Sequence, residues 1–435
     1  MHDAVEHAHA GAYLRRSCRR CAPIPAALLA SADGCQARKI VRHNPKMRGH
    51  PMRLTLLCVL AGHAAAQDIT VPLTPDRWTS YILFQREPRP RDKTVRFETH
   101  LGRTSLVVPS GLAYASGVNF RNGTIDADIA TDSTSAFYGI AFHVAGQHER
   151  YEIVFFRPPG ADPTLQYTPS FYDMNAWQFY PAPEYGRSPD FPQDRWVHLR
   201  IVVKGLVASI YVDTATTPTL EVHDLALGSV GGTIGIWGRN GGAYISNLTY
   251  RPDTTTYPLT REHTFAPGTI TAGWSLSQSF LASQQKPDVY PDVRSLQWQP
   301  VDAEREGIVM IGRYRKDPSV EPERPLRDRP ATLPPAIEVV FARNTIVSDR
   351  DTVRKMWIGY SDDVVVYLNG RPLYAGRNAM IYRDPAALGY FYPYADAVFL
   401  PLKKGKNELL LAVSEATAGW GFMARFDQPS APGAP

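Results

Sequence analysis

A pair of carboxylates in the chain has a spacing that glycoside chemistry could use. Asp126 and Asp128 lie in the sequence Ile-Asp-Ala-Asp-Ile. On a strand, residues two apart share a face, and the strand rise puts them roughly 6.6–7 Å apart. Retaining glycosidases hold two carboxyl groups about 5–5.5 Å apart, and inverting ones about 6.5–9.5 Å apart. Because Ile125, Ala127 and Ile129 form a complete core face, a solvated surface explains the aspartates better than catalysis; ligation of calcium or a sugar is the other alternative.

Glu152 and His143 are the remaining weak catalytic candidates. They lie in neighbouring apolar stretches, and their side chains could face each other across adjacent strands. The sequence contains no Gly-x-Ser-x-Gly elbow, His-Glu-x-x-His helix, Walker loop or dinucleotide fingerprint. It therefore predicts no cofactor and no reaction.

A metal is also not predicted, although calcium stays an open option. The sequence Ser361-Asp362-Asp363 offers oxygen ligands. Calcium needs six to eight oxygens, whereas adjacent aspartates on a strand point to opposite faces. Capping of a turn is the stronger interpretation of these residues.

Aromatic residues are concentrated between residues 167 and 185, among Pro, Asp and Asn. Aromatic faces stack on the apolar face of a pyranose ring, and nearby polar groups bond its hydroxyls. The stretch predicts a carbohydrate-binding groove; the alternative is a loop whose rings cover a sheet. The predicted ligand-binding residues are Arg157, Tyr167, Tyr172, Trp177, Tyr180, Trp420 and Arg425.

Short strands must position these residues. Runs rich in β-branched and aromatic residues are separated by Gly, Pro, Asn or Asp throughout the chain after residue 95. The run at 196–203 alternates, with Trp196, His198 and Arg200 on one face. This pattern predicts an all-β fold of two β-sandwich (jelly-roll) domains in tandem.

The segment at residues 52–66 is typical of a signal peptide, with Arg53, a short apolar run and an Ala-x-Ala end. Residues 1–51 are interpreted as a non-native or disordered extension. All four cysteines precede residue 66. Ten of the 47 basic residues and three of the 42 acidic residues also precede residue 66. The rest of the chain therefore has 37 basic and 39 acidic residues. The mature chain is therefore not basic, which argues against nucleic-acid binding. No later segment could span a membrane, and we expect a periplasmic or secreted protein.

The mature chain divides into two expected domains. These are residues 67–252 and 263–427, joined by a polar, Pro-containing linker at 253–262. Residues 313–335 are dense in Arg, Asp, Glu and Pro and are expected to form a long exposed loop. The tail at 428–435 is expected to be disordered.

The first expected domain resembles a known family. The carrying sequences are Asn-Gly-Thr-Ile-Asp-Ala-Asp-Ile at 122–129, Phe-Tyr-Gly-Ile-Ala-Phe-His at 137–143, Tyr-Glu-Ile-Val-Phe-Phe-Arg-Pro at 151–158 and Gly-Ile-Trp at 235–237. Over residues 75–252 their order resembles the concanavalin A-like lectin/glucanase sandwich, in its laminin-G-like and 3-keto-disaccharide hydrolase-like forms. The glucanase strand Glu-x-Asp-x-x-Glu has no match here, so the resemblance implies a fold and not an activity.

The second expected domain resembles the galactose-binding-like jelly roll of bacterial glycosidases. The resemblance covers residues 265–426 and rests on Tyr-Leu-Asn-Gly at 367–370, where Asn369-Gly370 predicts a two-residue hairpin, and on Lys-Gly-Lys-Asn-Glu-Leu at 404–409.

Together these patterns predict an exported protein that binds a polysaccharide or glycoconjugate. Two alternatives stay open. One is a glycoside hydrolase or related sugar-cleaving enzyme, and the other is an envelope scaffold or adhesion module that binds a protein partner. The sequence identifies neither the sugar nor the oligomeric state.

Overall fold

The computed structural model describes most of the chain after the expected signal peptide. The described residues are 67–81, 95–146, 149–172, 174–190, 194–228, 230–261, 263–315, 338–379, 382–383, 390–415 and 419–427. The predicted extension, signal peptide and tail, and most of the predicted exposed loop, lie outside these ranges. The described residues all belong to one compact unit that begins at Ala66. None of their helices is long and apolar enough to cross a membrane.

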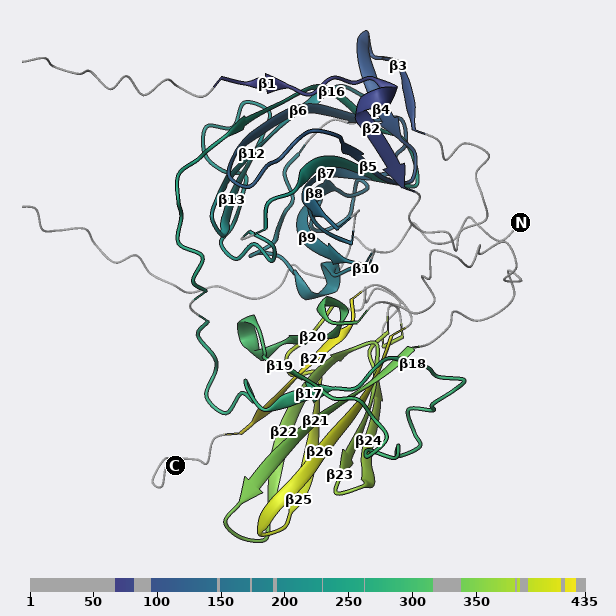
Figure 1. The fold of residues 1–435 in the computed structure, drawn as a ribbon, viewed down its shortest axis with the longest axis vertical. Helices are drawn as coiled ribbons and strands as arrows, with labels where there is room; N and C mark the ends of the chain where they lie inside the picture. Colours follow the sequence, from purple (N-terminus) through teal and green to yellow (C-terminus); the bar gives the residue numbers. More distant parts are fainter. Residues whose placement is uncertain are drawn as a thin grey trace, which may run out of the picture. The chain divides into compact units, whose positions relative to one another are not determined.

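The predicted all-β class is confirmed. Two antiparallel sheets, here called A and B, form the first sandwich and are seen as two layers in Figure 1. Sheet A has the order β14-β13-β12-β6-β16-β4-β3, with β1 beside β16. Its strands are β1 (Ile69–Thr70), β3 (Arg96–His100), β4 (Arg103–Val108), β6 (Gly123–Thr131), β12 (Val197–Lys204), β13 (Val207–Val212), β14 (Leu220–Val222) and β16 (Ala243–Pro252).

Sheet B covers the other side of the first core. Its order is β10-β9-β8-β7-β15-β5-β2, with β11 beside β9. Its strands are β2 (Trp78–Tyr81), β5 (Gly111–Ala115), β7 (Phe137–Ala145), β8 (Arg150–Phe156), β9 (Leu165–Phe171), β10 (Met174–Asn175), β11 (Gly186–Arg187) and β15 (Thr233–Arg239).

Alternation fixes the faces of sheet A, as predicted. Val197, Leu199 and Ile201 of β12 are buried in the core between the sheets, whereas His198 and Arg200 lie on the outer face. Their β6 neighbours follow the same pattern, because β6 and β12 pair antiparallel. The outer face of sheet A is therefore polar at His198 and Arg200 and at their β6 partners, Asp128 and Asp126.

Sheets C and D form the second sandwich around a core of their own. Sheet C has the order β19-β17-β21-β26-β23-β24, with β18 beside β21, and sheet D has the order β20-β27-β22-β25. Sheet C contains β17 (Trp274–Leu276), β18 (Phe280–Leu281), β19 (Gln299–Val301), β21 (Glu338–Ser348), β23 (Asp363–Leu368), β24 (Arg371–Arg377) and β26 (Gly405–Glu415). Sheet D contains β20 (Val309–Met310), β22 (Thr352–Ser361), β25 (Asp396–Leu402) and β27 (Gly421–Phe426).

The predicted hairpin between β23 and β24 is confirmed. Leu368 pairs with Arg371, so that Asn369 and Gly370 alone form the turn. Both turn residues have positive φ, 52° and 79°, as a type I′ turn requires.

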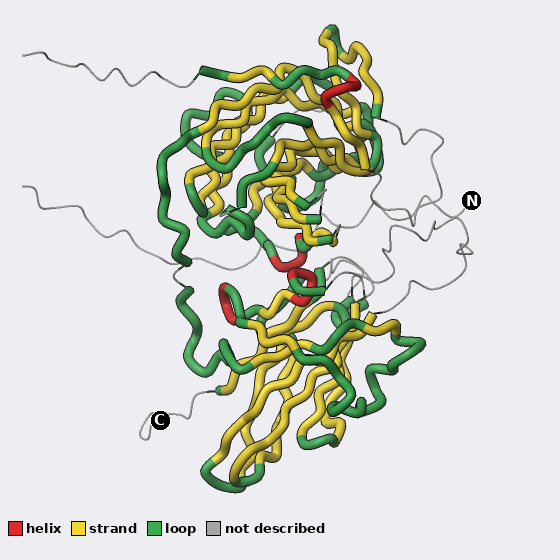
Figure 2. The backbone as a smooth tube through the Cα atoms, viewed as in Figure 1, coloured by secondary structure: helices red, strands yellow, loops and turns green. Residues whose placement is uncertain are grey.

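Short 3₁₀ helices occupy a few connections, shown in red in Figure 2: η1 (Pro75–Arg77), η2 (Trp177–Phe179), η3 (Arg305–Gly307) and η4 (Ile311–Arg313). Phe179 belongs to η2 of the first sandwich, and its ring packs against residues of the second sandwich. A Cβ at Gly419 would lie 2.6 Å from the Phe179 ring, and one at Gly421 would lie 2.9 Å from it. Phe179 also contacts Phe391 at 4.8 Å between ring centroids. These two glycines therefore make room for an aromatic ring between the sandwiches.

Candidate functional site

Glu152 and His143 do face each other, as predicted, but inside the core. His143 Nδ1 lies 2.5 Å from Glu152 Oε2, and its Nε2 lies 2.8 Å from the Arg121 carbonyl oxygen. Tyr167 donates a hydrogen bond of 2.7 Å to Glu152 Oε1, and the Leu227 amide donates another of 2.9 Å. All three side chains are fully buried. The bond from the Leu227 amide to Glu152 fixes the loop after β14 to sheet B.

Two predicted ring contacts are corrected by this burial. The Tyr167 hydroxyl is a hydrogen-bond partner of Glu152. Burial is the main cause, and the Glu152 charge the second, of a pKa of the Tyr167 phenol well above the usual value. Tyr180 is also buried, with its ring 4.1 Å from the Arg305 guanidinium. Neither ring has a face that a sugar could reach, because both fill space between the elements that they join.

Asp126 and Asp128 share the outer face of sheet A, and each carboxylate contacts His198 and one arginine. His198 lies between them, 3.1 Å from Asp126 and 3.0 Å from Asp128. Arg200 adds a contact of 2.7 Å to Asp126, and Arg103 adds one of 2.5 Å to Asp128. The geometry matches a solvated, ion-paired face.

Arg157 and Trp177 are the predicted ligand residues that the structure brings together. Arg157 is 7% exposed, and its guanidinium lies 5.6 Å from the centroid of the half-buried Trp177 ring. Arg157 Nη1 donates to Gln166 Oε1 at 3.2 Å and to the Tyr390 hydroxyl at 2.9 Å. Tyr390 belongs to the second sandwich and was not predicted, because nothing in its local sequence marks a partner 233 positions away.

The other predicted residues lie elsewhere. Tyr172 is half-buried against the first core. Trp420 is buried in the second core, where its Nε1 donates to the Val413 carbonyl oxygen at 3.3 Å, so its predicted ligand contact is corrected to a packing role. Arg425 lies on sheet D and contacts the ring of Tyr394 at 5.2 Å. The predicted ligand set is therefore dispersed over both sandwiches.

Asp362 and Asp363 do not form a recognisable metal site. Asp362 is buried, and Asp363 lies 3.5 Å from the Arg377 guanidinium. Within the described ranges, no group of three or more His, Cys, Asp or Glu side chains is placed to hold a metal ion. Calcium binding stays an untested option of the sequence.

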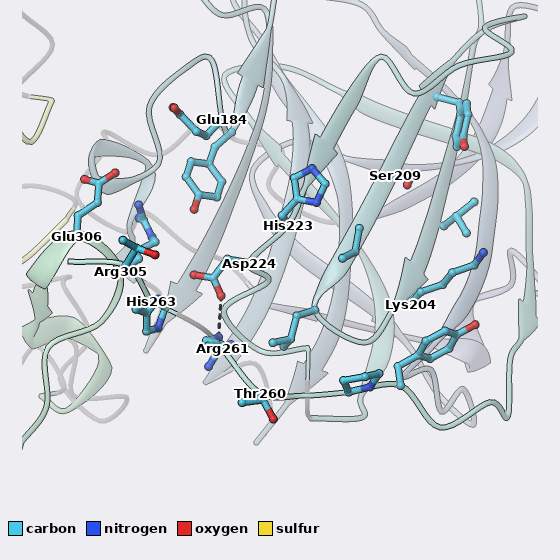
Figure 3. A pocket seen from close by; sticks show the side chains of 18 residues that line it. Glu184, Lys204, Ser209, His223, Asp224, Thr260, Arg261, His263, Arg305 and Glu306 are labelled. Carbon is cyan, nitrogen blue, oxygen red and sulfur yellow. Dashed lines mark hydrogen bonds and ion pairs between the residues drawn. The ribbon is translucent and has the colours of Figure 1, made fainter. Parts of the chain in front are cut away.

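A pocket of about 880 Å³ opens on the outer face of sheet A, beside the predicted linker (Figure 3). We call it the linker pocket. Its volume lies within the range of about 300–1,000 Å³ that small-ligand sites occupy. Its lining is Glu184, Tyr185, Val202, Lys204, Leu206, Val207, Ser209, Tyr211, His223, Asp224, Tyr257, Pro258, Thr260, Arg261, His263, Thr264, Arg305 and Glu306.

Sheet A forms one wall of the linker pocket through the outward side chains of two strands and the glycine turn between them. Residues Val202 and Lys204 of β12, and Ser209 and Tyr211 of β13, point away from the core. Gly205 forms the turn between these strands with φ +63°, and a Cβ there would lie 2.8 Å from Tyr257 Cβ. A larger residue would push the linker away from the sheet.

Hydrogen bonds from Arg261 and Tyr257 position the linker itself. Arg261 Nε donates to Asp224 Oδ1 at 2.7 Å, and its Nη2 donates to the Leu225 and Ala226 carbonyl oxygens at 2.5 and 3.0 Å. Tyr257 donates its hydroxyl to Asp253 Oδ2 at 2.5 Å, and this bond raises the pKa of Tyr257. The opposite wall of the pocket is therefore fixed by ion pairing and hydrogen bonds.

The linker pocket contains charged side chains of both signs, and they lie at its two ends. Glu184, Arg305, Glu306 and His263 gather at one end in Figure 3, and Lys204 lies at the other. Arg305 is buried beside the rings of Tyr180 and Tyr185, at 4.1 and 4.7 Å. Burial opposes its charge, but the two phenols and Glu306 raise the pKa of Arg305 above the usual value. Arg305 therefore stays a cation at the end of the pocket that also contains Glu184 and Glu306.

Sequence reasoning missed the linker pocket. Its residues come from five separate segments, and local sequence marks residues 253–262 only as a linker. The available signal was the composition of this stretch, since Tyr257 and Arg261 can make specific contacts that a flexible linker does not need.

Comparisons with known proteins leave the family open. No family model matches the chain, and no curated protein matches its sequence. The carbohydrate-binding module CBM66 from Bacillus subtilis is 14% identical, with a TM-score of 0.30 over 40% of this chain and 94% of that one. A Bacillus licheniformis β-glucanase is 12% identical, with a TM-score of 0.30 over 44% of this chain and 99% of that one. A pseudo β-1,3-glucanase of Mycobacterium tuberculosis is 11% identical, with a TM-score of 0.29 over 41% of this chain and 92% of that one. Likenesses with TM-scores this low carry no functional argument.

Proposed function

We propose that this chain is an exported protein that binds a carbohydrate, and that the linker pocket is its main binding site. The observation that carries the proposal is the lining of the pocket, where three tyrosine rings stand among balanced charges and hydroxyls. The proposal of export rests on the segment at residues 52–66, which lies outside the described residues.

A carbohydrate fits this lining better than a strongly charged or a fully apolar ligand. Three cationic side chains (Lys204, Arg261 and Arg305) are balanced by three carboxylates, so the pocket has no net field for a polyanion or polycation. The half-exposed rings of Tyr211 and Tyr257 offer apolar faces with polar edges. Sugar hydroxyls both donate and accept hydrogen bonds, which suits mixed charged partners.

Binding to a glycan array, followed by calorimetry with the best oligosaccharide, tests the proposal. Tyr211→Ala and Tyr257→Ala should each weaken binding by about tenfold, the loss of one favourable ring contact worth about 1.4 kcal/mol. Tyr382→Ala is the matched control, because Tyr382 is exposed and lies outside the pocket. If no glycan binds, or if both pocket variants bind like the wild type, the proposal fails.

Arg157 and Trp177 stay a predicted second point of ligand contact. The Trp177 ring is half-buried, and the Arg157 guanidinium lies 5.6 Å from its centroid. Trp177→Ala, measured with the same oligosaccharide, should weaken binding if the ligand reaches this pair. Unchanged affinity would leave Arg157 and Trp177 as contacts between the sandwiches only.

A further inference from the structure

Three Asn-Gly pairs occur in the chain, at residues 122–123, 240–241 and 369–370. Asparagine is a thermolabile residue, and a following glycine makes its side-chain amide easier to lose. Glycine has no Cβ, so its backbone nitrogen can approach Cγ of the preceding asparagine without hindrance. The fold decides which of the three pairs can reach this arrangement.

Two of the three asparagine side chains are held by hydrogen bonds. Asn122 is 8% exposed, and its Oδ1 accepts the Gly205 amide at 2.8 Å. Asn369 Nδ2 donates to Asn407 Oδ1 at 3.0 Å, and Asn369 Oδ1 accepts the Glu408 amide at 2.8 Å. Rotation of either side-chain amide toward the following glycine would break these bonds, which costs free energy. Both pairs are therefore protected in the folded protein.

The third asparagine, Asn240, is exposed in the turn between β15 and β16. Among the described residues, its side-chain amide has no hydrogen-bond partner. Asn240 has φ +58°, and Gly241 has φ +149°. A Cβ on Gly241 would lie 2.5 Å from Ser133 Cβ, so the turn has no room for a side chain at this position. The Asn240 amide can therefore rotate toward the unhindered nitrogen of Gly241.

Two hydroxyl groups face the peptide group that joins Asn240 to Gly241. Ser133 Oγ and Ser135 Oγ lie 3.1 and 3.3 Å from the Asn240 carbonyl oxygen, in donor geometry. They also lie 3.0 Å from each other, so they can donate to this oxygen directly or as a chain. The Gly241 nitrogen must lose its proton before it attacks, and the resulting charge is shared with the same carbonyl oxygen. Donors placed where charge develops stabilise the charged form, so the two serines favour the reactive state.

We propose that Asn240-Gly241 is a site of spontaneous deamidation in the folded protein, with water as the co-reactant. The Gly241 nitrogen gives its proton to water or hydroxide and forms a bond to Asn240 Cγ. The bond from Cγ to Nδ2 breaks, and ammonia leaves after it takes up a proton from solvent. A water molecule then opens the cyclic imide at one of its two carbonyl carbons, which gives aspartate or isoaspartate. No oxidant or reductant takes part.

The modification changes the connection between the two sheets of the first sandwich. β15 belongs to sheet B and β16 to sheet A, and residues 240–242 join them. Isoaspartate adds one carbon atom to the backbone of this connection, and both products add a negative charge. Asp132 lies beside the turn, because its Oδ1 accepts the Gly242 amide at 2.9 Å. The new carboxylate therefore meets a like charge, which disfavours the modified turn.

Peptide mapping by mass spectrometry tests the inference on the full chain, incubated at mildly alkaline pH. Folded wild type should gain the mass of amide hydrolysis at Asn240 at least about tenfold faster than at Asn122 or Asn369. The same chain unfolded in urea is the control for the sequence itself, because all three pairs should then react at similar rates. This experiment uses no carbohydrate, so its result is independent of the proposed binding function.

The role of the serines has its own variants. Ser133→Ala combined with Ser135→Ala should slow the reaction at Asn240 by about two- to tenfold, the range that a neutral hydrogen bond contributes. Ser188→Ala is the matched control, because Ser188 is an exposed serine that donates to Asp162 Oδ1 outside this turn. Asn369 in the same samples reports any loss of structure, since it is protected only in the folded protein.

Two results would overturn the inference. Asn240 is not a modification site if it stays intact in the folded wild type, or if it reacts no faster than Asn369. The serines do not promote the reaction if the double variant keeps or exceeds the wild-type rate at Asn240 while Asn369 stays protected. Should the double variant unfold, Ser135→Ala alone decides the same question, because Ser135 is exposed and Ser133 keeps its place against Gly241.

Discussion

Arg261 holds Asp224 through a hydrogen bond of 2.7 Å between Nε and Oδ1, and thereby ties the linker to the loop after β14. The same guanidinium satisfies two carbonyl oxygens of that loop. The loop is held from its other side by Glu152, which accepts the Leu227 amide. One short loop therefore connects the buried Glu152 network with the wall of the linker pocket.

Arg261→Ala should loosen the linker pocket and destabilise the protein. It removes an ion pair whose side chains are largely shielded and a hydrogen bond to the Leu225 carbonyl oxygen, while the Ala226 carbonyl oxygen keeps a contact of 3.5 Å with Arg313 Nη1. Hydrogen bonds to charged groups contribute about 1.5–3 kcal/mol, so we expect a loss of that order in urea unfolding. Arg195→Ala, at the more exposed pair with Asp213, should cost less than about 1 kcal/mol. Equal losses for the two variants would contradict the special role of Arg261.

Glu152→Ala should destabilise the protein without a specific effect on chemistry. Leaving a buried hydrogen-bonding group without its partner costs about 1–3 kcal/mol, and His143, Tyr167 and the Leu227 amide would all lose a partner. Thermal unfolding measures this loss, with Glu221→Ala at a half-exposed surface position as the control. The wild type could instead release reducing ends from a polysaccharide. If a stable Glu152→Gln variant then lost this activity, Glu152 would be identified as catalytic.

Gly419→Ala should disturb the contact between the sandwiches. The added Cβ would lie 2.6 Å from the Phe179 ring and 3.0 Å from Gln178 Oε1. Overpacking of this kind costs about 1–3 kcal/mol. Limited proteolysis should then cut the chain near residues 253–262 faster than in the wild type. Phe179→Leu combined with Gly419→Ala provides the control, because the smaller side chain should relieve part of the clash. A protease-resistant Gly419→Ala variant would argue against a tight fit here.

The bond between Asp253 and Tyr257 predicts a specific dependence of stability on pH. Hydrogen bonds from Thr255 and Tyr257 lower the pKa of Asp253 from 3.8, so its contribution is complete above 3.8 and is lost as pH falls through the lowered value. The same bond raises the pKa of Tyr257 from 10.0, so its contribution is complete below 10.0 and is lost at higher pH. The stability difference between the wild type and Asp253→Ala should therefore stay constant from about pH 5 to about pH 9 and shrink outside that window. A steady slope within the window would contradict this.

Much of the fold could be predicted because it depends on local patterns. The alternation around His198 and Arg200 identified the outer face of sheet A, and Asn369-Gly370 identified a hairpin. The facing of His143 and Glu152 followed from two neighbouring apolar strands. Each of these features is decided within one strand or one strand pair.

The site could not be predicted in the same way. Tyr180 looks like a loop residue in sequence, but Arg305, far along the chain, covers its ring. Arg157 could be singled out as a residue that follows an apolar strand, yet its partner Tyr390 follows from tertiary packing. The linker pocket likewise depends on where residues 257–264 cross sheet A. Position in space decides exposure, and local sequence carries little of that information.

The buried cluster of the first sandwich includes Ile308, Met310, Phe391 and Met423, which belong to the second half of the chain. A protein cut at residue 262 would expose these side chains in one fragment and leave unfilled hydrophobic contacts in the other. Both halves should consequently melt together in a single calorimetric transition, and neither should be soluble when expressed alone.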